Sequence, residues 1–353
     1  MTVESTTRPA SRIADLDALR GLAALAVVLF HYTTRFEELY GHSAPLPVGV
    51  PWGHYGVQLF FGISGFVIFM TLDRTRSLTD FAVSRASRLF PAYWTAMVLT
   101  TAAVAIAGMD HLLLGWGELA VNATMVQNFV GVRSVDGVYW TLSVELAFYC
   151  VMAALWRLRL LPRIEQVLLV WLSLKWVWAF APALLGVELS WLAGALLVQD
   201  YIPYFALGIA AYRVKCRPGH AGWPLAAIAA SLVTIGACDG IIDLLVGMVT
   251  AFALLAVALA RVPLLGTAGP VWLGAISYSL YLLHEFIGFA LLRALEGAGI
   301  AAPAAVAVTI AAVLLLAACV TFLIERPALQ AIRAWYRELC DRRLERAALV
   351  AAE

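Results

Sequence analysis

The sequence predicts an all-α integral membrane protein with about ten transmembrane helices and both termini in the cytoplasm. Its composition is the first observation behind this prediction. Of 353 residues, 63% are hydrophobic and 13% are charged, and the mean hydropathy is +0.86. Soluble globular chains carry roughly 25% charged residues. A soluble fold cannot hide this much apolar surface, so we expect the lipid bilayer to surround the chain.

The second observation is a series of ten apolar runs, each close to the roughly 20 residues that a bilayer crossing requires. The first run begins near Asp15 and passes His31 without a small-residue cleavage site, which favours a retained helix over a signal peptide. Beside the sixth run, residues 185–200 could form a separate re-entrant or interfacial piece. The ten expected spans are 16–35, 57–73, 89–108, 138–156, 163–182, 198–214, 222–237, 242–261, 271–292 and 302–324.

The third observation is the distribution of Lys and Arg, which are enriched on the cytoplasmic side of membrane proteins. With the N-terminus inside, 20 of the 24 basic residues fall on inner segments; the exceptions are Arg35, Arg133, Lys175 and Arg293. Basic residues near both ends favour an even number of spans.

The predicted organisation is a cytoplasmic tail at 1–12, one polytopic domain at 13–328 and a cytoplasmic tail at 329–353. We expect a short helix in the C-terminal tail. The longest outer connections, 36–56 and 109–137, are long enough to carry function.

Composition also excludes several classes of function. The net charge of +1 provides no global field for nucleic acid. The five cysteines are scattered and lie outside any ligand spacing with histidine, so neither a metal site nor a disulfide framework is expected.

Charged side chains inside a membrane cost several kcal/mol, so each is a candidate for function. In the first run, LDALRGLAALAVVLFHY, Arg20 and His31 are eleven residues apart and share a helix face about 16 Å apart. Asp17 precedes Arg20 by three residues and can pair with it. The alternative is that these are packing residues satisfied by neighbouring helices.

Two further helices are expected to place polar groups at a similar depth. Glu145 lies about two turns into the fourth run and His284, followed by Glu285, lies in the outer half of the ninth. A buried carboxylate requires a partner. The agreement in depth with His31 predicts one shared cavity, whereas separate helix–helix hydrogen bonds are the alternative.

The inner loop 72–90 contains RASRLFPAYW, in which Arg85 and Arg88 face together if helical. Guanidinium groups suit phosphate oxygens, although the preference for positive charge inside also accounts for them. The GISGF segment of the second run favours close helix packing through Gly62 and Gly65.

These segments resemble the membrane-bound acyltransferase-3 family of O-acyltransferases, in its stand-alone form, over about residues 13–328. Arg20 and His31 match its first-helix signature, and Arg85 and Arg88 match its Arg-x-x-Arg motif. One departure is S-V-E-L at Glu145, where many relatives have two adjacent acidic residues. The six matching blocks are LDALRGLAALAVVLFHY, GVQLFFGISGFVIF, RASRLFPAYW, WTLSVELAFY, SYSLYLLHEF and IERPA.

The resemblance implies transfer of an acyl group, usually acetyl, from cytoplasmic acyl-CoA to a hydroxyl of a glycan or lipid-linked sugar at a bacterial inner membrane. Acyl-CoA is then a co-substrate, bound at its phosphates by Arg85 and Arg88, and no metal is expected. His31 is expected to act as general base or to carry the acyl group. Arg20 would hold CoA or the first-helix geometry, and Glu145 or His284 would orient His31.

Two other classes compete with the enzyme. A transporter of an acyl group, a glycan or an ion also places polar residues on an inner helix face, although the sequence contains no inverted repeat of the kind transporters often have. A non-catalytic scaffold or sensor is the second, and it predicts that Arg20 and His31 tolerate substitution.

Overall fold

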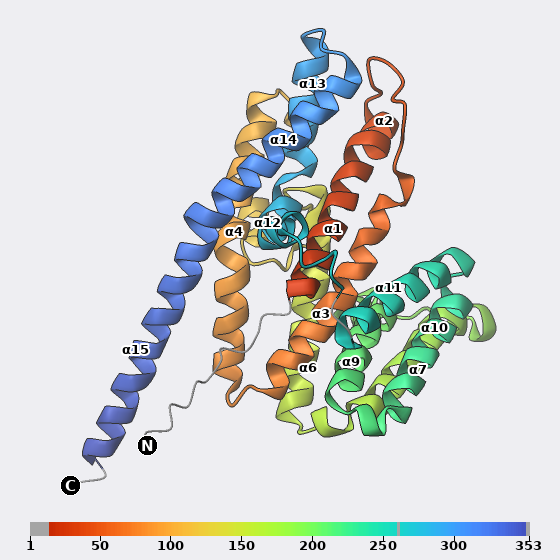
Figure 1. Ribbon diagram of the computed structural model, residues 1–353, viewed down its shortest axis with the longest axis vertical. Coiled ribbons are helices and arrows are strands. Elements are labelled where there is room, and N and C mark those ends of the chain that lie inside the picture. Colours follow the sequence, from red (N-terminus) through yellow and green to blue (C-terminus); the bar gives the residue numbers. More distant parts are fainter. Residues whose placement is uncertain (1–13, 260–261, 351–353) are drawn as a thin grey trace.

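The computed structural model describes residues 14–259 and 262–350, and its regular elements in these ranges are all helices (Figure 1). The all-α prediction is therefore confirmed for this part of the chain. The N-terminal tail predicted at 1–12 lies outside the described residues. The long helices form an elongated bundle, with α13 and α14 at one end and the lower half of α15 at the other.

Over the described residues, each predicted span coincides with helical structure. Between the main helices lie the short helices α2 (Phe36–Leu39), α5 (Trp116–Asn122) and α8 (Trp191–Leu196). The main helices are α1 (Ala14–Phe30), α3 (Gly56–Asp73), α4 (Leu78–Ile106), α6 (Trp140–Arg157), α7 (Ile164–Leu185), α9 (Ile202–Cys216), α10 (Gly222–Cys238), α11 (Ile241–Leu259), α12 (Ala268–Leu283), α13 (Glu285–Gly297), α14 (Ala302–Val320) and α15 (Arg326–Val350).

Six helices among the described residues are long and apolar enough to cross a membrane, and the bent pair of α12 and α13 makes a seventh. The count of ten spans and the cytoplasmic termini remain predictions. Helices α9 and α10 have 15 and 17 residues, fewer than the roughly 20 of a full crossing. The sequence allowed for a separate piece at residues 185–200, and this segment contains the short helix α8.

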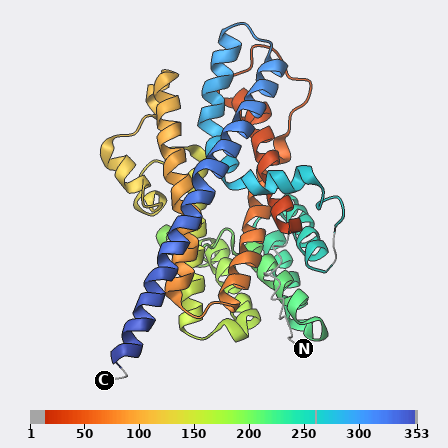
Figure 2. The same cartoon turned by 60° about the vertical axis from the view of Figure 1, so that its left-hand side comes forward.

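The ninth predicted span, 271–292, is broken in the structure. Helices α12 and α13 meet at His284 with a bend of 75°, so α12 lies across the bundle while α13 rises along it (Figure 2). Two hydroxyls from distant segments donate to backbone carbonyls at the break: Tyr32 Oη donates to the His284 carbonyl at 2.6 Å, and Tyr139 Oη to the Leu282 carbonyl at 3.2 Å. Such partners make a broken helix tolerable at membrane depth.

Helices α1 and α12 pack against each other at two glycines. A Cβ on Gly21 would lie 2.4 Å from the Gly274 nitrogen, and a Cβ on Gly274 would lie 2.2 Å from the Asp17 carbonyl oxygen. Since such contacts are sterically impossible for a side chain, only glycine permits this crossing.

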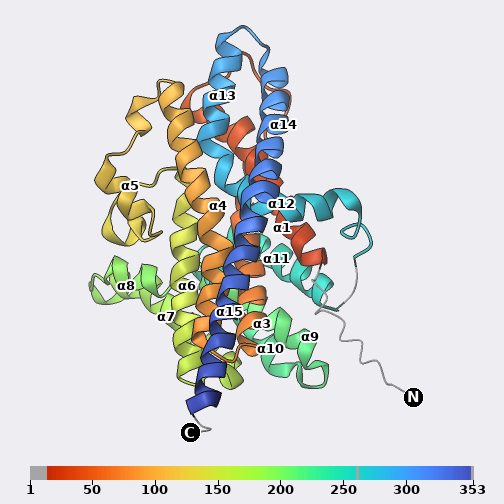
Figure 3. The ribbon, with the colours of Figure 1, turned by 90° about the vertical axis from the view of Figure 1, so that its left-hand side faces the viewer.

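The C-terminal segment is longer than the short helix expected from the sequence. Helix α14 continues into α15 through the π-turn Thr321–Glu325, and α15 itself has 25 residues. It passes alongside α4 (Figure 3), where Tyr336 Oη donates to Asp80 Oδ1 at 2.7 Å. The domain boundary predicted at 328 therefore falls within one continuous helix.

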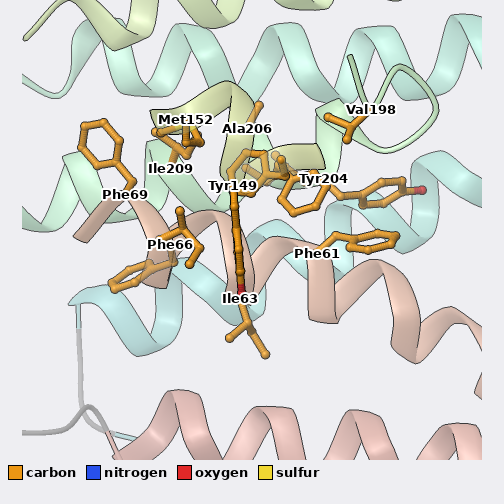
Figure 4. Packing of buried hydrophobic residues seen from close by; sticks show 14 of the residues in the cluster. Phe61, Ile63, Phe66, Phe69, Tyr149, Met152, Val198, Tyr204, Ala206 and Ile209 are labelled. Carbon is orange, nitrogen blue, oxygen red and sulfur yellow. The ribbon is translucent and has the colours of Figure 1, made fainter. Parts of the chain in front are cut away.

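The core lies between α3, α6 and α9, where Phe61, Phe66 and Tyr204 are packed among aliphatic side chains (Figure 4). The close packing predicted for GISGF is confirmed. A Cβ on Gly65 would lie 2.1 Å from the Phe205 carbonyl oxygen, and one on Gly208 would lie 1.8 Å from that of Gly62. This packing fixes α3, which carries Ser64 into the site described below.

Candidate active site

The structure brings His31 and His284 together. His31 Nδ1 lies 3.2 Å from His284 Nε2, and the ring centroids are 4.8 Å apart. Each histidine follows its crossing glycine, Gly21 or Gly274, by ten residues, so the α1–α12 contact sets their separation. His31 begins the π-turn His31–Arg35, and π-turns inside α-helices frequently mark functional sites.

Backbone carbonyls determine which nitrogen of each ring carries the proton. His284 Nδ1 lies 2.8 Å from the Tyr281 carbonyl oxygen, which can only accept, so this nitrogen donates. In the neutral ring, His284 Nε2 is then an acceptor. His31 Nδ1 therefore donates, both to the Val27 carbonyl at 2.8 Å and towards His284. The lone pair of His31 is therefore left on Nε2.

A carboxyl pair lies beside this free nitrogen. Glu285 Oε1 is 3.8 Å from His31 Nε2. The Glu285 side chain also interacts with that of Asp136, just before α6. Asp136 in turn accepts from the backbone N–H of Phe286 at 3.1 Å and of Val138 at 3.3 Å.

A cavity of about 860 Å³ runs from the end of the bundle where α3 meets α4 to Tyr281. Seven basic residues line it against the two acids Asp17 and Glu145. Tyr281 separates the cavity from the histidines, because its ring centroid is 5.7 Å from that of His284 and its hydroxyl meets Thr141 Oγ1 at 3.0 Å. The basic residues are Arg20, Arg74, Arg85, Arg88, Lys215, Arg326 and Arg333.

Glu145 lies in this cavity, away from the histidine pair. Its Oε1 accepts from Tyr149 Oη at 2.5 Å and from Ser64 Oγ at 3.0 Å. The prediction of one cavity shared by His31, Glu145 and His284 is wrong in this respect, because residues at equal depth can lie on different sides of a bundle. His284 contacts His31, and Glu145 does not.

The two arginines of the Arg-x-x-Arg motif differ in their partners. Arg88 Nη1 donates to Glu325 Oε1 at 2.6 Å, and Ser279 Oγ donates to the other oxygen of that buried carboxylate at 2.9 Å. Among the described residues no carboxylate pairs with Arg85, whose Nε is buried without a hydrogen-bond partner. Arg85 is therefore the member of the motif that is free to bind an anion.

Arg20 pairs with Asp17 as predicted, with Nη1 2.9 Å from Oδ1. The ion pair lines the cavity, where Arg88 and Glu145 also act on Arg20, whereas His31 lies outside the cavity lining.

Sequence reasoning missed three acidic residues of this site. Glu285 adjoins His284 and Glu325 lies within IERPA, but neither position predicts a role in the site. Asp136 carried no signal beyond its place before WTLSVE.

No group of three or more His, Cys, Asp or Glu residues in the described ranges is arranged to hold a metal ion.

Comparison with known proteins places the chain among acyltransferases. The family model described as an acyltransferase domain matches residues 13–324. The exopolysaccharide production protein ExoZ of Rhizobium meliloti (strain 1021) is 29% identical over 314 residues, covering 80% of this chain and 91% of ExoZ.

Two further relatives match shorter stretches. Nodulation protein 10 of Rhizobium leguminosarum bv. viciae is 30% identical over 123 residues, 29% of this chain and 34% of that protein. The putative acetyltransferase ORF330 of Acidianus two-tailed virus is 28% identical over 144 residues, 40% of each chain. No solved structure matches significantly.

Proposed function

Since this chain belongs to the acyltransferase-3 family, we propose that it transfers an acyl group, most simply acetyl, from cytoplasmic acyl-CoA to a hydroxyl of a carbohydrate or glycan-like acceptor. We place it in the bacterial inner membrane. The cavity carries this proposal, because it is lined by basic residues and ends one aromatic ring from the histidine pair. The relative named an exopolysaccharide production protein supports a polysaccharide acceptor.

The donor fits the cavity by charge and by size. CoA presents phosphate groups that guanidinium groups bind well, and Arg85 has no competing carboxylate among the described residues. A volume of about 860 Å³ is at the upper part of the range for pockets that enclose a ligand. The pantetheine arm would pass Ser64 and Glu145 and bring the thioester to Tyr281.

The chemistry follows from the protonation of the histidines. His31 Nε2 takes the proton from the acceptor hydroxyl, whose oxygen attacks the thioester carbonyl. The carbon–sulfur bond breaks, and the proton returns from His31 to the sulfur, giving the ester and free CoA thiol. Because the Val27 carbonyl and His284 both accept from His31 Nδ1, the ring keeps the tautomer that this step requires.

The test is release of CoA thiol from acetyl-CoA by purified protein in nanodiscs, with and without a bacterial exopolysaccharide as acceptor. His31→Ala is expected to lower the rate by about 10³-fold, with unchanged thermal unfolding. The matched control is His111→Ala, an exposed histidine in an outer connection, which should retain full rate. An active His31→Ala variant would refute the assignment of the base.

One observation favours keeping the transporter as a second candidate. Broken helices at a binding site are common in transporters, and α12 and α13 are bent by 75° at His284. Movement of a glycan across the bilayer of proteoliposomes without CoA release would support transport. CoA release coupled to ester formation in detergent would support the enzyme.

A further inference from the structure

The strongest unassigned feature is the pair of buried carboxyl groups beside His31. Asp136 is fully buried and Glu285 is 7% exposed. Gly137 keeps the two segments close, since a Cβ at that position would lie 2.4 Å from Glu285 Oε2. Two carboxylates that interact in a buried site cannot both carry a full charge, so the pair holds a proton.

Hydrogen bonds place that proton on Glu285. Both oxygens of Asp136 accept backbone N–H groups, from Val138 and Phe286, which favours the ionised form of this carboxyl. Glu285 has only a share of the Val138 N–H, and its Oε2 has no hydrogen-bond partner. Glu285 is therefore the member that donates to Asp136.

The surroundings add few competing charges. The titratable groups that face the pair come from the first helix and its π-turn, from η2 (Pro51–Tyr55), from the turn before α6, and from α12 and its bend. Tyr40 of α2 also faces Glu285, and His54 faces His31. Arg35 alone among these described groups is permanently charged; the others are His31, Tyr32, Tyr139, Tyr281 and His284.

We propose that Asp136 and Glu285 share one proton and one negative charge, and that this pair positions and charge-balances His31 during acyl transfer. The inference rests on the proposed function. When His31 Nε2 takes the acceptor proton, the Glu285 proton moves to Asp136, and the new Glu285 carboxylate faces the imidazolium across 3.8 Å. When CoA leaves, His31 gives its proton to the sulfur and the Asp136 proton returns to Glu285, so the pair keeps one proton and one charge throughout.

The variants Asp136→Asn, Glu285→Gln and the double variant test this, because the amides preserve shape and each single variant leaves one carboxyl to carry the charge. We expect each single variant to lose about 10-fold in kcat and the double variant about 1,000-fold, more than the product. The acid limb of the rate–pH profile should move to lower pH in the double variant, because no negative charge then stabilises the imidazolium. The proposal would be overturned if the kcat loss of the double variant equals the product of the two single losses and its rate–pH profile is unchanged.

Infrared difference spectroscopy gives a readout that needs no acyl transfer. The spectrum of the natural protein minus that of Glu285→Gln should contain the C=O stretch of a protonated carboxyl, and its absence would also overturn the proposal. The matched control is Glu118→Gln, an outer carboxylate paired with Arg133, which should show no such band. If the natural protein releases no CoA, the proposed function fails, and the infrared result still decides whether the pair holds a proton.

Discussion

The carbonyl of Tyr281 has a large influence on the chemistry of His31. By accepting from His284 Nδ1 it leaves His284 Nε2 as an acceptor, and that acceptor in turn leaves the lone pair of His31 on Nε2. His284, which does not touch substrate, therefore acts with the Val27 carbonyl, 2.8 Å from His31 Nδ1, to select the basic nitrogen.

His284→Gln tests this relay, since a glutamine oxygen can accept from His31 Nδ1 whereas alanine cannot. We expect His284→Ala to lower kcat about 100-fold and His284→Gln to restore part of that loss, with the KM for acyl-CoA unchanged in both. Equal rates for the two variants would show that the acceptor at this position is unimportant.

Arg85 and Arg88 should respond differently to substitution. Arg88→Ala leaves Glu325, 1% exposed, without its cation, so we expect a loss of roughly 3 kcal/mol in the free energy of unfolding. Arg85→Ala should instead raise the KM for acetyl-CoA about 10-fold, by losing a charge-assisted phosphate contact, with little change in unfolding temperature. Thermal unfolding and steady-state kinetics on the same preparations separate the two effects, and the reverse pattern would contradict the assignment.

Several site residues were predictable because their signals are local. Arg20, His31 and His284 are polar groups within apolar runs, and the pairing of Arg20 with Asp17 follows from helix spacing. The partner of Arg88 was not predictable, since Glu325 is 237 residues away. Glu145 was misplaced because apolar patterning gives depth in the membrane but not the direction in which a helix faces.

At the scale of elements, the crossing of α1 and α12 is the contact on which the site depends. Gly274→Val would force these helices apart, because any Cβ there meets the Asp17 carbonyl. We expect a loss of at least about 100-fold in kcat, since a misplacement of about 1 Å can cost that much. The matched control is Gly269→Ala in the first turn of the same helix, where a Cβ would meet nothing within 4 Å; a comparable loss there would contradict this explanation.

The bend between α12 and α13 shows why this element was predicted as one span. Residues 271–292 form a mostly apolar run that includes His284 and Glu285 but no proline, so no helix-breaking residue marks the position of the bend. The groups that stabilise the bend, Tyr32, Tyr139 and Asp136, come from two other segments. Helix existence could thus be predicted from the sequence, whereas helix continuity depends on tertiary contacts.

At the scale of the whole molecule, the net charge of +1 conceals a strong local imbalance. The cavity collects seven basic residues against two acids. Helix α15 supplies two of them, Arg326 and, from the segment predicted as a tail at 329–353, Arg333. The field that attracts an anionic donor is therefore built from four segments of the chain that are far apart in sequence.

Salt should consequently weaken donor binding. We expect the KM for acetyl-CoA to rise severalfold between 0.01 and 0.15 M salt, as the Debye length falls from about 30 to about 8 Å. Arg333→Ala should raise the KM and reduce this salt dependence. Arg337→Ala, on the same helix but outside the cavity lining, serves as the control. A KM that is insensitive to salt would contradict the assignment of donor binding to the basic residues of the cavity.

The glycine crossing also has a mechanical consequence. Gly21 and Gly274 act as a fulcrum, with each histidine at the end of a lever ten residues, or about 15 Å, long. A tilt of about 4° at the fulcrum displaces a ring by about 1 Å over that length. The positions of the two imidazoles therefore depend on helix packing about three turns away. A substitution that slightly alters this packing, with little change in unfolding temperature, is expected to lower the rate.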